Sequence, residues 1–135
     1  MNSTRFLVPL GRALLVAIFL FGVPGHFTPA YAQYAAQQGV PIPQLLVPLS
    51  GILMLAGGLS VLLGYRAKLG AWLLVLFLVP VTLTMHKFWA ESDAMMAQMQ
   101  IAMFMKNVSI LGAALLLTHF GAGPVSLDAR ARAAA

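Results

Sequence analysis

The sequence predicts an all-α integral membrane protein, a four-helix bundle with a short interfacial helix in its first outer loop. From Ala13 to Tyr65 the chain contains no Asp, Glu, Lys or Arg, so a soluble domain would have too little charged surface to face water. Of the 135 residues, 61% are hydrophobic and 8% are charged, and the mean hydropathy is +0.90, values typical of membrane proteins. We therefore expect one transmembrane domain that covers residues 1–135.

Four apolar runs approach the roughly 20 helical residues that cross a bilayer. They cover residues 6–23, 45–64, 69–86 and 101–120. Two of them reach this length only by including a cation, Arg12 in the first run and Lys106 in the fourth. The simpler interpretation is that each long side chain extends its charge to the headgroups. The functional alternative is a buried cation that holds an anionic or quinone-like ligand.

Capping residues place the shorter elements between these spans. Thr28 followed by Pro29 can begin a short helix, and Gly39 can end it. Beyond the third span, Trp89 follows a phenylalanine and marks the outer membrane interface. Ser92 is a good N-cap residue and Asp93 suits the first helical turn, so the fourth helix is predicted to begin near Asp93, in the headgroup region.

The basic residues predict the orientation of the chain. If the N-terminus lies inside the cell, only Lys87 and Lys106 lie toward the outer side. The cytoplasmic side then holds Arg5, Arg12, Arg66, Lys68, Arg130 and Arg132. This bias predicts that both termini are cytoplasmic. A cleavable signal sequence ending at Ala30-Tyr31-Ala32 is the alternative, and its removal would leave three spans in the same orientation.

Several chemistries are excluded or disfavoured by composition. The chain has no cysteine, which excludes disulfides, dithiol chemistry and thiolate metal sites. Its net charge of +5 comes from basic residues scattered at segment ends, which form no stripe for nucleic acid. We expect no intrinsic cofactor. The expected partners are the lipid bilayer and either a partner subunit or a second copy of the chain.

Polar residues at the outer ends of the spans form the candidate ligand or partner site. These residues are His26, His86, Lys106 and Asn107. Polar groups at this depth are costly, so they indicate a site, or else they hydrogen-bond one another and nearby carbonyl groups. A haem held by the two histidines and a Cu(I) site on the stripe Met95, Met99 and Met103 are less favoured alternatives, and we expect no metal.

Small residues predict where the helices pack closely. Ala56, Ser60 and Gly64 recur every four residues along the second span, beside Gly57 and Gly58. Small side chains let helix backbones approach one another inside lipid. Gly112, Ala113 and Ala114 are expected to serve the same purpose in the fourth span.

The residues from His86 onward resemble the signature of the DoxX family of small bacterial membrane proteins. The resemblance rests on His86, Trp89, Lys106-Asn107, Gly112 and a tail that contains Gly121, Gly123, Ser126 and Asp128. Gly11-Arg12 in the first span agrees with it. The resemblance implies an inner-membrane protein that is an accessory or quinone-proximal subunit of an oxidoreductase assembly, with quinone as a ligand.

Two alternatives stay open beside that resemblance. One is a structural, cargo-binding or lipid-binding membrane protein without a redox role, whose outer polar cluster recognises the partner. The other is transport of a small solute or metal, which the chain's lack of paired charges within its spans disfavours. Asp128 follows the fourth span on the side of Arg12 and Arg66, so we expect it to form an ion pair or a hydrogen bond to a loop.

Overall fold

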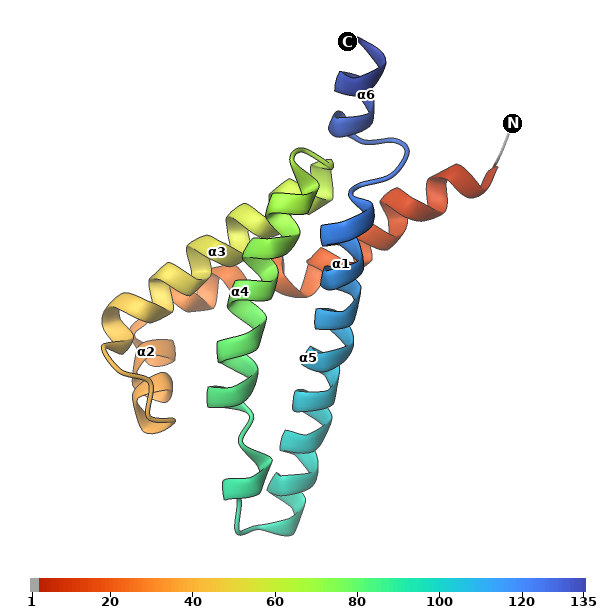
Figure 1. The fold of residues 1–135 in the computed structure, drawn as a ribbon. Coiled ribbons are helices and arrows are strands. Elements are labelled where there is room, and N and C mark those ends of the chain that lie inside the picture. The colour runs from red at the N-terminus through yellow and green to blue at the C-terminus, as the bar shows by residue number, and fades with distance from the viewer. Residues whose placement is uncertain (1–2) are drawn as a thin grey trace.

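The computed structural model describes residues 3–135, and these residues form helices and connecting turns without a strand (Figure 1). The predicted all-α fold class is confirmed. The elements are η1 (Ser3–Phe6), α1 (Leu7–Gly22), η2 (Val23–Phe27), α2 (Pro29–Gln37), α3 (Pro43–Leu63), α4 (Ala67–Met85), η3 (Phe88–Ala90), α5 (Ala94–Phe120) and α6 (Leu127–Ala133).

The long helices pack in the order α1, α3, α4 and α5, with α1 lying obliquely across the others (Figure 1). Both ends of the chain lie at the same end of the bundle, which we name the terminal end. The turn from α4 through η3 to α5 lies at the opposite end, which we name the hairpin end. An even number of passes explains why the two ends of the chain lie together.

Within residues 3–135, four helical segments are long and apolar enough to cross a membrane. They are Thr4–Phe27, Pro43–Leu63, Ala67–Ala90 and Ala94–Phe120. The fourth begins at Ala94, before the apolar run at residue 101. Its N-cap is Asp93 and not Ser92 as predicted, because the Asp93 carboxylate accepts a hydrogen bond from the Met96 backbone nitrogen at 2.8 Å. With 27 residues, α5 is about 40 Å long and exceeds the hydrocarbon core of about 30 Å.

The first loop contains the predicted short helix, α2, but its cap differs from the expectation. Thr28 occupies the N-cap position and its hydroxyl donates to the Gly25 carbonyl at 2.7 Å, so it does not cap the helix with its side chain. Pro29 is the first helical residue, as predicted. Gly39 follows the helix with a φ of +83°, a conformation that suits glycine after a helix end.

Glycines bring α1, α3 and α4 into close contact around the apolar core. A methyl group at Gly57 would lie 2.9 Å from the Gly70 carbonyl oxygen, and one at Gly58 would lie 2.8 Å from the Leu20 side chain. In the fourth span the prediction is confirmed for Ala114, which is buried in the core, and is wrong for Gly112, where a methyl group would meet no described atom within 4 Å. The core itself contains Val16, Phe19, Met54, Val61, Ala71, Leu74, Phe77, Leu78 and Ala114.

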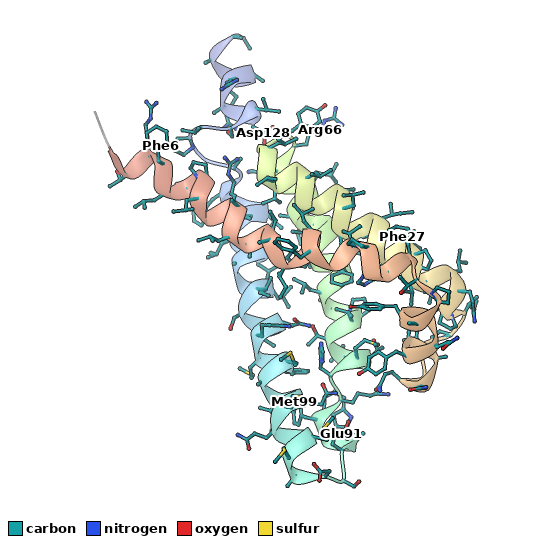
Figure 2. All side chains as sticks on the ribbon, turned by 180° about the vertical axis from the view of Figure 1, so that it is seen from behind. Phe6, Phe27, Arg66, Glu91, Met99 and Asp128 are labelled. Atoms are coloured by element: carbon teal, nitrogen blue, oxygen red, sulfur yellow. The ribbon has the colours of Figure 1, made fainter. Side chains whose placement is uncertain are left out.

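The outward faces of the bundle carry large apolar side chains, as expected where lipid is the solvent. α5 is the extreme case, since only Asn107 and Ala114 on it are buried. Figure 2 shows its Met99 beside Glu91 at the hairpin end, well away from the segment between Phe6 and Phe27. The part of α5 toward the hairpin end is therefore covered by α4 and η3 on one side only.

Candidate functional site

The structure separates His26 from the other members of the predicted outer cluster. Its Nδ1 atom lies 3.0 Å from the Gly22 carbonyl oxygen, and its ring lies 5.1 Å from that of Tyr31 and 5.9 Å from that of Phe77. Phe77 precedes His86 by nine positions on α4, which is about 13 Å along the helix axis. His26 therefore packs within the bundle and has no contact with His86.

His86 and its neighbour Lys87 instead tie the hairpin end together. The His86 Nδ1 atom lies 2.9 Å from Oε1 of Gln100 on α5, and the Lys87 ammonium donates to the Gln38 carbonyl at 2.7 Å. These two hydrogen bonds join the end of α4 to α5 and to the first loop. The sequence analysis missed Gln100, although a glutamine within an apolar run was a signal for a polar contact.

Lys106 and Asn107 are adjacent on α5 but face different surroundings. Asn107 is buried, with 7% of its surface exposed, whereas Lys106 is exposed. The ammonium of Lys106 contacts the Met103 sulfur at 3.5 Å. Successive residues of a helix point about 100° apart. Asn107 therefore faces the bundle, whereas its neighbour Lys106 faces the surrounding lipid.

The methionine stripe lies on the exposed side of α5. Met95, Met99 and Met103 are 77%, 53% and 37% exposed. Within residues 3–135 no group of three or more His, Cys, Asp or Glu side chains is arranged to hold a metal ion. Trp89 is also exposed, and its ring lies 6.1 Å from that of Phe104, beside the first turns of α5.

A second polar cluster lies at the terminal end, around Asp128. Its two carboxylate oxygens accept hydrogen bonds from the backbone nitrogens of Arg66 and Ala67, at 2.7 and 3.0 Å. Its own backbone nitrogen donates to the Gly64 carbonyl at 2.8 Å. The expected hydrogen bond from Asp128 to a loop is confirmed, and it closes the turn between α3 and α4.

Arg12 is buried beside this turn, with 3% of its surface exposed. Its Nη2 atom donates to the Val125 carbonyl at 2.7 Å, and its Nη1 atom lies against Gly64. Nε and Nη1 have no hydrogen-bond partner among the described residues. The guanidinium is thus buried among protein atoms, where it joins α1 to the segment before α6.

The remaining motif residues shape the connection from α5 to α6. Gly121 and Gly123 adopt φ values of +76° and +68°, which favour glycine because a Cβ atom would be strained there. Ser126 caps α6 by accepting from the Ala129 backbone nitrogen at 3.1 Å. These residues bring Asp128 back to the α3–α4 turn.

Comparison with known proteins identifies the family. The model of the SURF4 family matches residues 44–133, which contain α3 from its second residue, α4 to α6, and the whole Asp128 cluster except Arg12. The chain belongs to the SURF4 family. Its DoxX assignment from the motif residues is therefore wrong. The physical reason is that glycines and a capping serine at a helix end meet a general need for tight turns, so they distinguish small membrane bundles poorly.

The chain is also similar to three known proteins. The chain is 32% identical to the inner membrane protein YphA of Escherichia coli, over 96% of this chain and 100% of YphA. It is 28% identical to the inner membrane protein YqjF of Escherichia coli, over 90% and 88%. It is 30% identical to the ER-derived vesicles protein ERV29 of Saccharomyces cerevisiae, over 57% of this chain and 24% of ERV29. No solved structure matches the chain.

This SURF4-family chain is an integral inner-membrane protein. The four apolar helices and the two inner-membrane relatives support this localisation together. The expected oxidoreductase role and quinone ligand rested on the corrected resemblance, and the SURF4 match gives them no support. The orientation of the two ends stays a prediction.

Proposed function

We propose that this chain is a partner-binding protein of the inner membrane without a redox role, and that it binds another membrane protein along the outer part of α5. The single observation that carries the proposal is Lys106. Its ammonium lies on the exposed side of an apolar span, where the hydrogen bond that it makes among the described residues is to the Met103 sulfur, at 3.5 Å. A cation in this setting is costly until a carboxylate or carbonyl group reaches it.

The partner is a different protein rather than a second copy, because this chain has no suitable carboxylate to offer. Its acidic residues are Glu91, Asp93 and Asp128. Asp93 is about 20 Å from Lys106 along α5, at about 1.5 Å per residue, and Glu91 precedes it in the hairpin turn. Asp128 is engaged at the terminal end. A partner helix with an acidic side chain at the depth of Lys106 would supply the missing group.

The surface around Lys106 is suited to such a helix. Met99, Met103 and Met105 are all exposed, and flexible thioether side chains adapt to varied apolar surfaces. The hydrogen bonds of His86 to Gln100 and of Lys87 to Gln38 hold the hairpin end in place. Lys106 is thus presented on a fixed helix rather than on a mobile loop.

Copurification with crosslinking tests the proposal. A photocrosslinking amino acid at Met99 should capture a second protein in cells, and Lys106→Ala should abolish the product while Lys106→Arg keeps it. Arg5→Ala is the matched control, since it also removes one exposed cation but at the terminal end. Capture that Lys106→Ala leaves unchanged would contradict the proposal, as would a product that contains only two copies of this chain.

The same variants separate partner binding from a redox role. Quinone-dependent electron flow should be equal in membranes that carry the wild-type chain, Lys106→Ala or His86→Ala. Loss of electron flow with an unchanged set of crosslinked proteins would favour an oxidoreductase subunit instead.

A further inference from the structure

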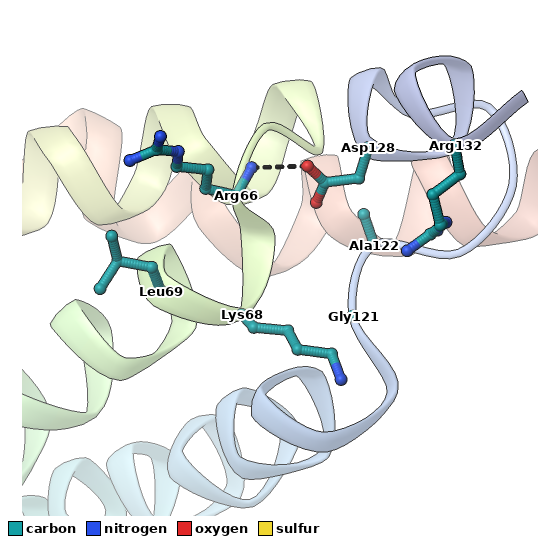
Figure 3. A pocket seen from close by; sticks show the side chains of 7 residues that line it. All are labelled: Arg66, Lys68, Leu69, Gly121, Ala122, Asp128 and Arg132. Atoms are coloured by element: carbon teal, nitrogen blue, oxygen red, sulfur yellow. Dashed lines mark hydrogen bonds between the residues drawn. The ribbon is translucent and has the colours of Figure 1, made fainter. Parts of the chain in front are cut away.

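A small basic pocket lies at the terminal end, far from Lys106 and the hairpin end. Its volume is about 260 Å³, and Figure 3 shows it between the start of α4, the connection after α5 and the helix α6. The lining includes Arg66, Lys68, Leu69, Asp128 and Arg132. Three of these side chains are cationic and one is anionic.

The carboxylate of Asp128 does not neutralise these cations by pairing with them. Both of its oxygens already accept hydrogen bonds from the backbone nitrogens of Arg66 and Ala67. The guanidinium of Arg66 lies over the Tyr65 ring, 5.8 Å from its centroid, and in Figure 3 this side chain extends away from Asp128. Lys68 and Arg132 are therefore the cations left to meet a ligand.

Lys68 and Arg132 come from different elements and approach the same segment. The alkyl stem of Lys68 crosses Gly121, since a methyl group there would lie 3.4 Å from the Lys68 Cε atom. Figure 3 shows Arg132 extending from α6 toward the same connection. Two like charges directed to one place repel each other, so an anion between them would be stabilised by both.

The pocket opens onto an apolar stripe of α4. Leu69 lines the pocket and begins a row of exposed side chains at helical spacing. The row consists of Leu69, Trp72, Leu76, Val79 and Leu83. It runs about 21 Å along the membrane-crossing helix, which is the direction an acyl chain takes in a bilayer.

We propose that this pocket binds the phosphate group of an anionic phospholipid, with Lys68 and Arg132 on the phosphate and the acyl chains along the Leu69 stripe. Basic pockets at the ends of membrane helices are suited to anionic headgroups. A soluble phosphate ester offers the same charge but has nothing to place on the stripe, so the geometry favours the lipid.

Native mass spectrometry of the full chain in uncharged detergent micelles tests this site. Dioleoyl phosphatidylglycerol should bind, and dioleoyl phosphatidylcholine should not. Lys68→Gln with Arg132→Gln should weaken phosphatidylglycerol binding about 25-fold, at about fivefold for each basic residue. Arg5→Gln with Arg130→Gln removes the same charge outside this pocket and should change the affinity less than twofold. Circular dichroism verifies that each variant is folded.

Two results would overturn the proposal. One is equal phosphatidylglycerol binding by the Lys68/Arg132 double variant and the wild-type chain. The other is displacement of the lipid by an equal concentration of glycerol phosphate, which would identify a site for a soluble phosphate ester. Arg132→Gln alone provides a second measure, since it lies on the exposed side of α6 outside the spans, and it should weaken lipid binding about fivefold.

Discussion

The carboxylate of Asp128 lies 2.7 Å from the backbone nitrogen of Arg66, which precedes it by 62 positions. The same carboxylate accepts a hydrogen bond from Ala67, so a residue of α6 caps the N-terminus of α4 from across the chain. A negative charge at this position also interacts favourably with the helix dipole. This contact fixes the terminal end of the bundle.

Asp128→Ala should lower the free energy of unfolding by about 1.5–3 kcal/mol, the usual range for hydrogen bonds to a charged group. Asp93→Ala is the matched comparison, because Asp93 caps α5 through one local hydrogen bond and should cost about 1 kcal/mol. Unfolding by SDS in detergent micelles measures both changes. Equal losses would show that the contact from Asp128 to the α3–α4 turn adds nothing beyond a local cap.

Gly64→Ala should be severely destabilising. Gly64 has a φ of +64°, and a methyl group there would overlap the guanidinium of Arg12 and the Cβ atom of Ser126. Gly112→Ala is the control, since that methyl group would meet nothing within 4 Å, and it should stabilise α5 by about 0.5–1 kcal/mol. Thermal unfolding in micelles distinguishes them, and a Gly64→Ala protein of wild-type stability would refute the close packing of Arg12 on this turn.

Arg12→Met should be more stable than Arg12→Ala by about 2 kcal/mol or more. Both changes remove a buried cation that makes one hydrogen bond, to the Val125 carbonyl, but only alanine also leaves a cavity. Denaturant titration of the two variants measures the difference. If the two variants were equally stable, the pocket around Arg12 would have to collapse around the smaller side chain.

Single cysteines test the predicted orientation, because the native chain has none. In intact cells a membrane-impermeant maleimide should label Ser92→Cys at the hairpin end and leave Ala134→Cys unlabelled. Permeabilised cells should label both. Labelling of Ala134→Cys alone in intact cells would reverse the orientation, and labelling of both would contradict the common location of the two ends.

The long helices were predictable from the apolar runs. Within lipid a single crossing segment must satisfy its own backbone hydrogen bonds, and the α-helix does so. The glycines that were predicted to lie at close helix contacts differ in outcome. Gly57 contacts the α4 backbone as the small-residue pattern predicts, whereas Gly112 faces open space. The sequence alone does not show which side of a helix contacts a neighbouring helix, so the prediction for Gly112 was wrong.

The candidate sites were less predictable because they depend on contacts between distant positions. Arg66 adopts a φ of +47°, unusual for a side chain with a Cβ atom, and this turn presents two backbone nitrogens to Asp128. No local pattern signals that geometry. Likewise, equal depth in the bilayer suggested that His26 would meet His86, but the five residues of η2 turn His26 inward against Phe77.

The contact between Asp128 and the α3–α4 turn has a consequence for biosynthesis. Residues 64–67 leave the ribosome long before residue 128. The backbone nitrogens of Arg66 and Ala67 therefore have no Asp128 carboxylate to bond while the rest of the chain is synthesised. Arg12 also lacks its partner at this stage, since the Val125 carbonyl that accepts its hydrogen bond is synthesised late. The terminal end can therefore close only after the last crossing is inserted, which makes its closure a mark of completed assembly.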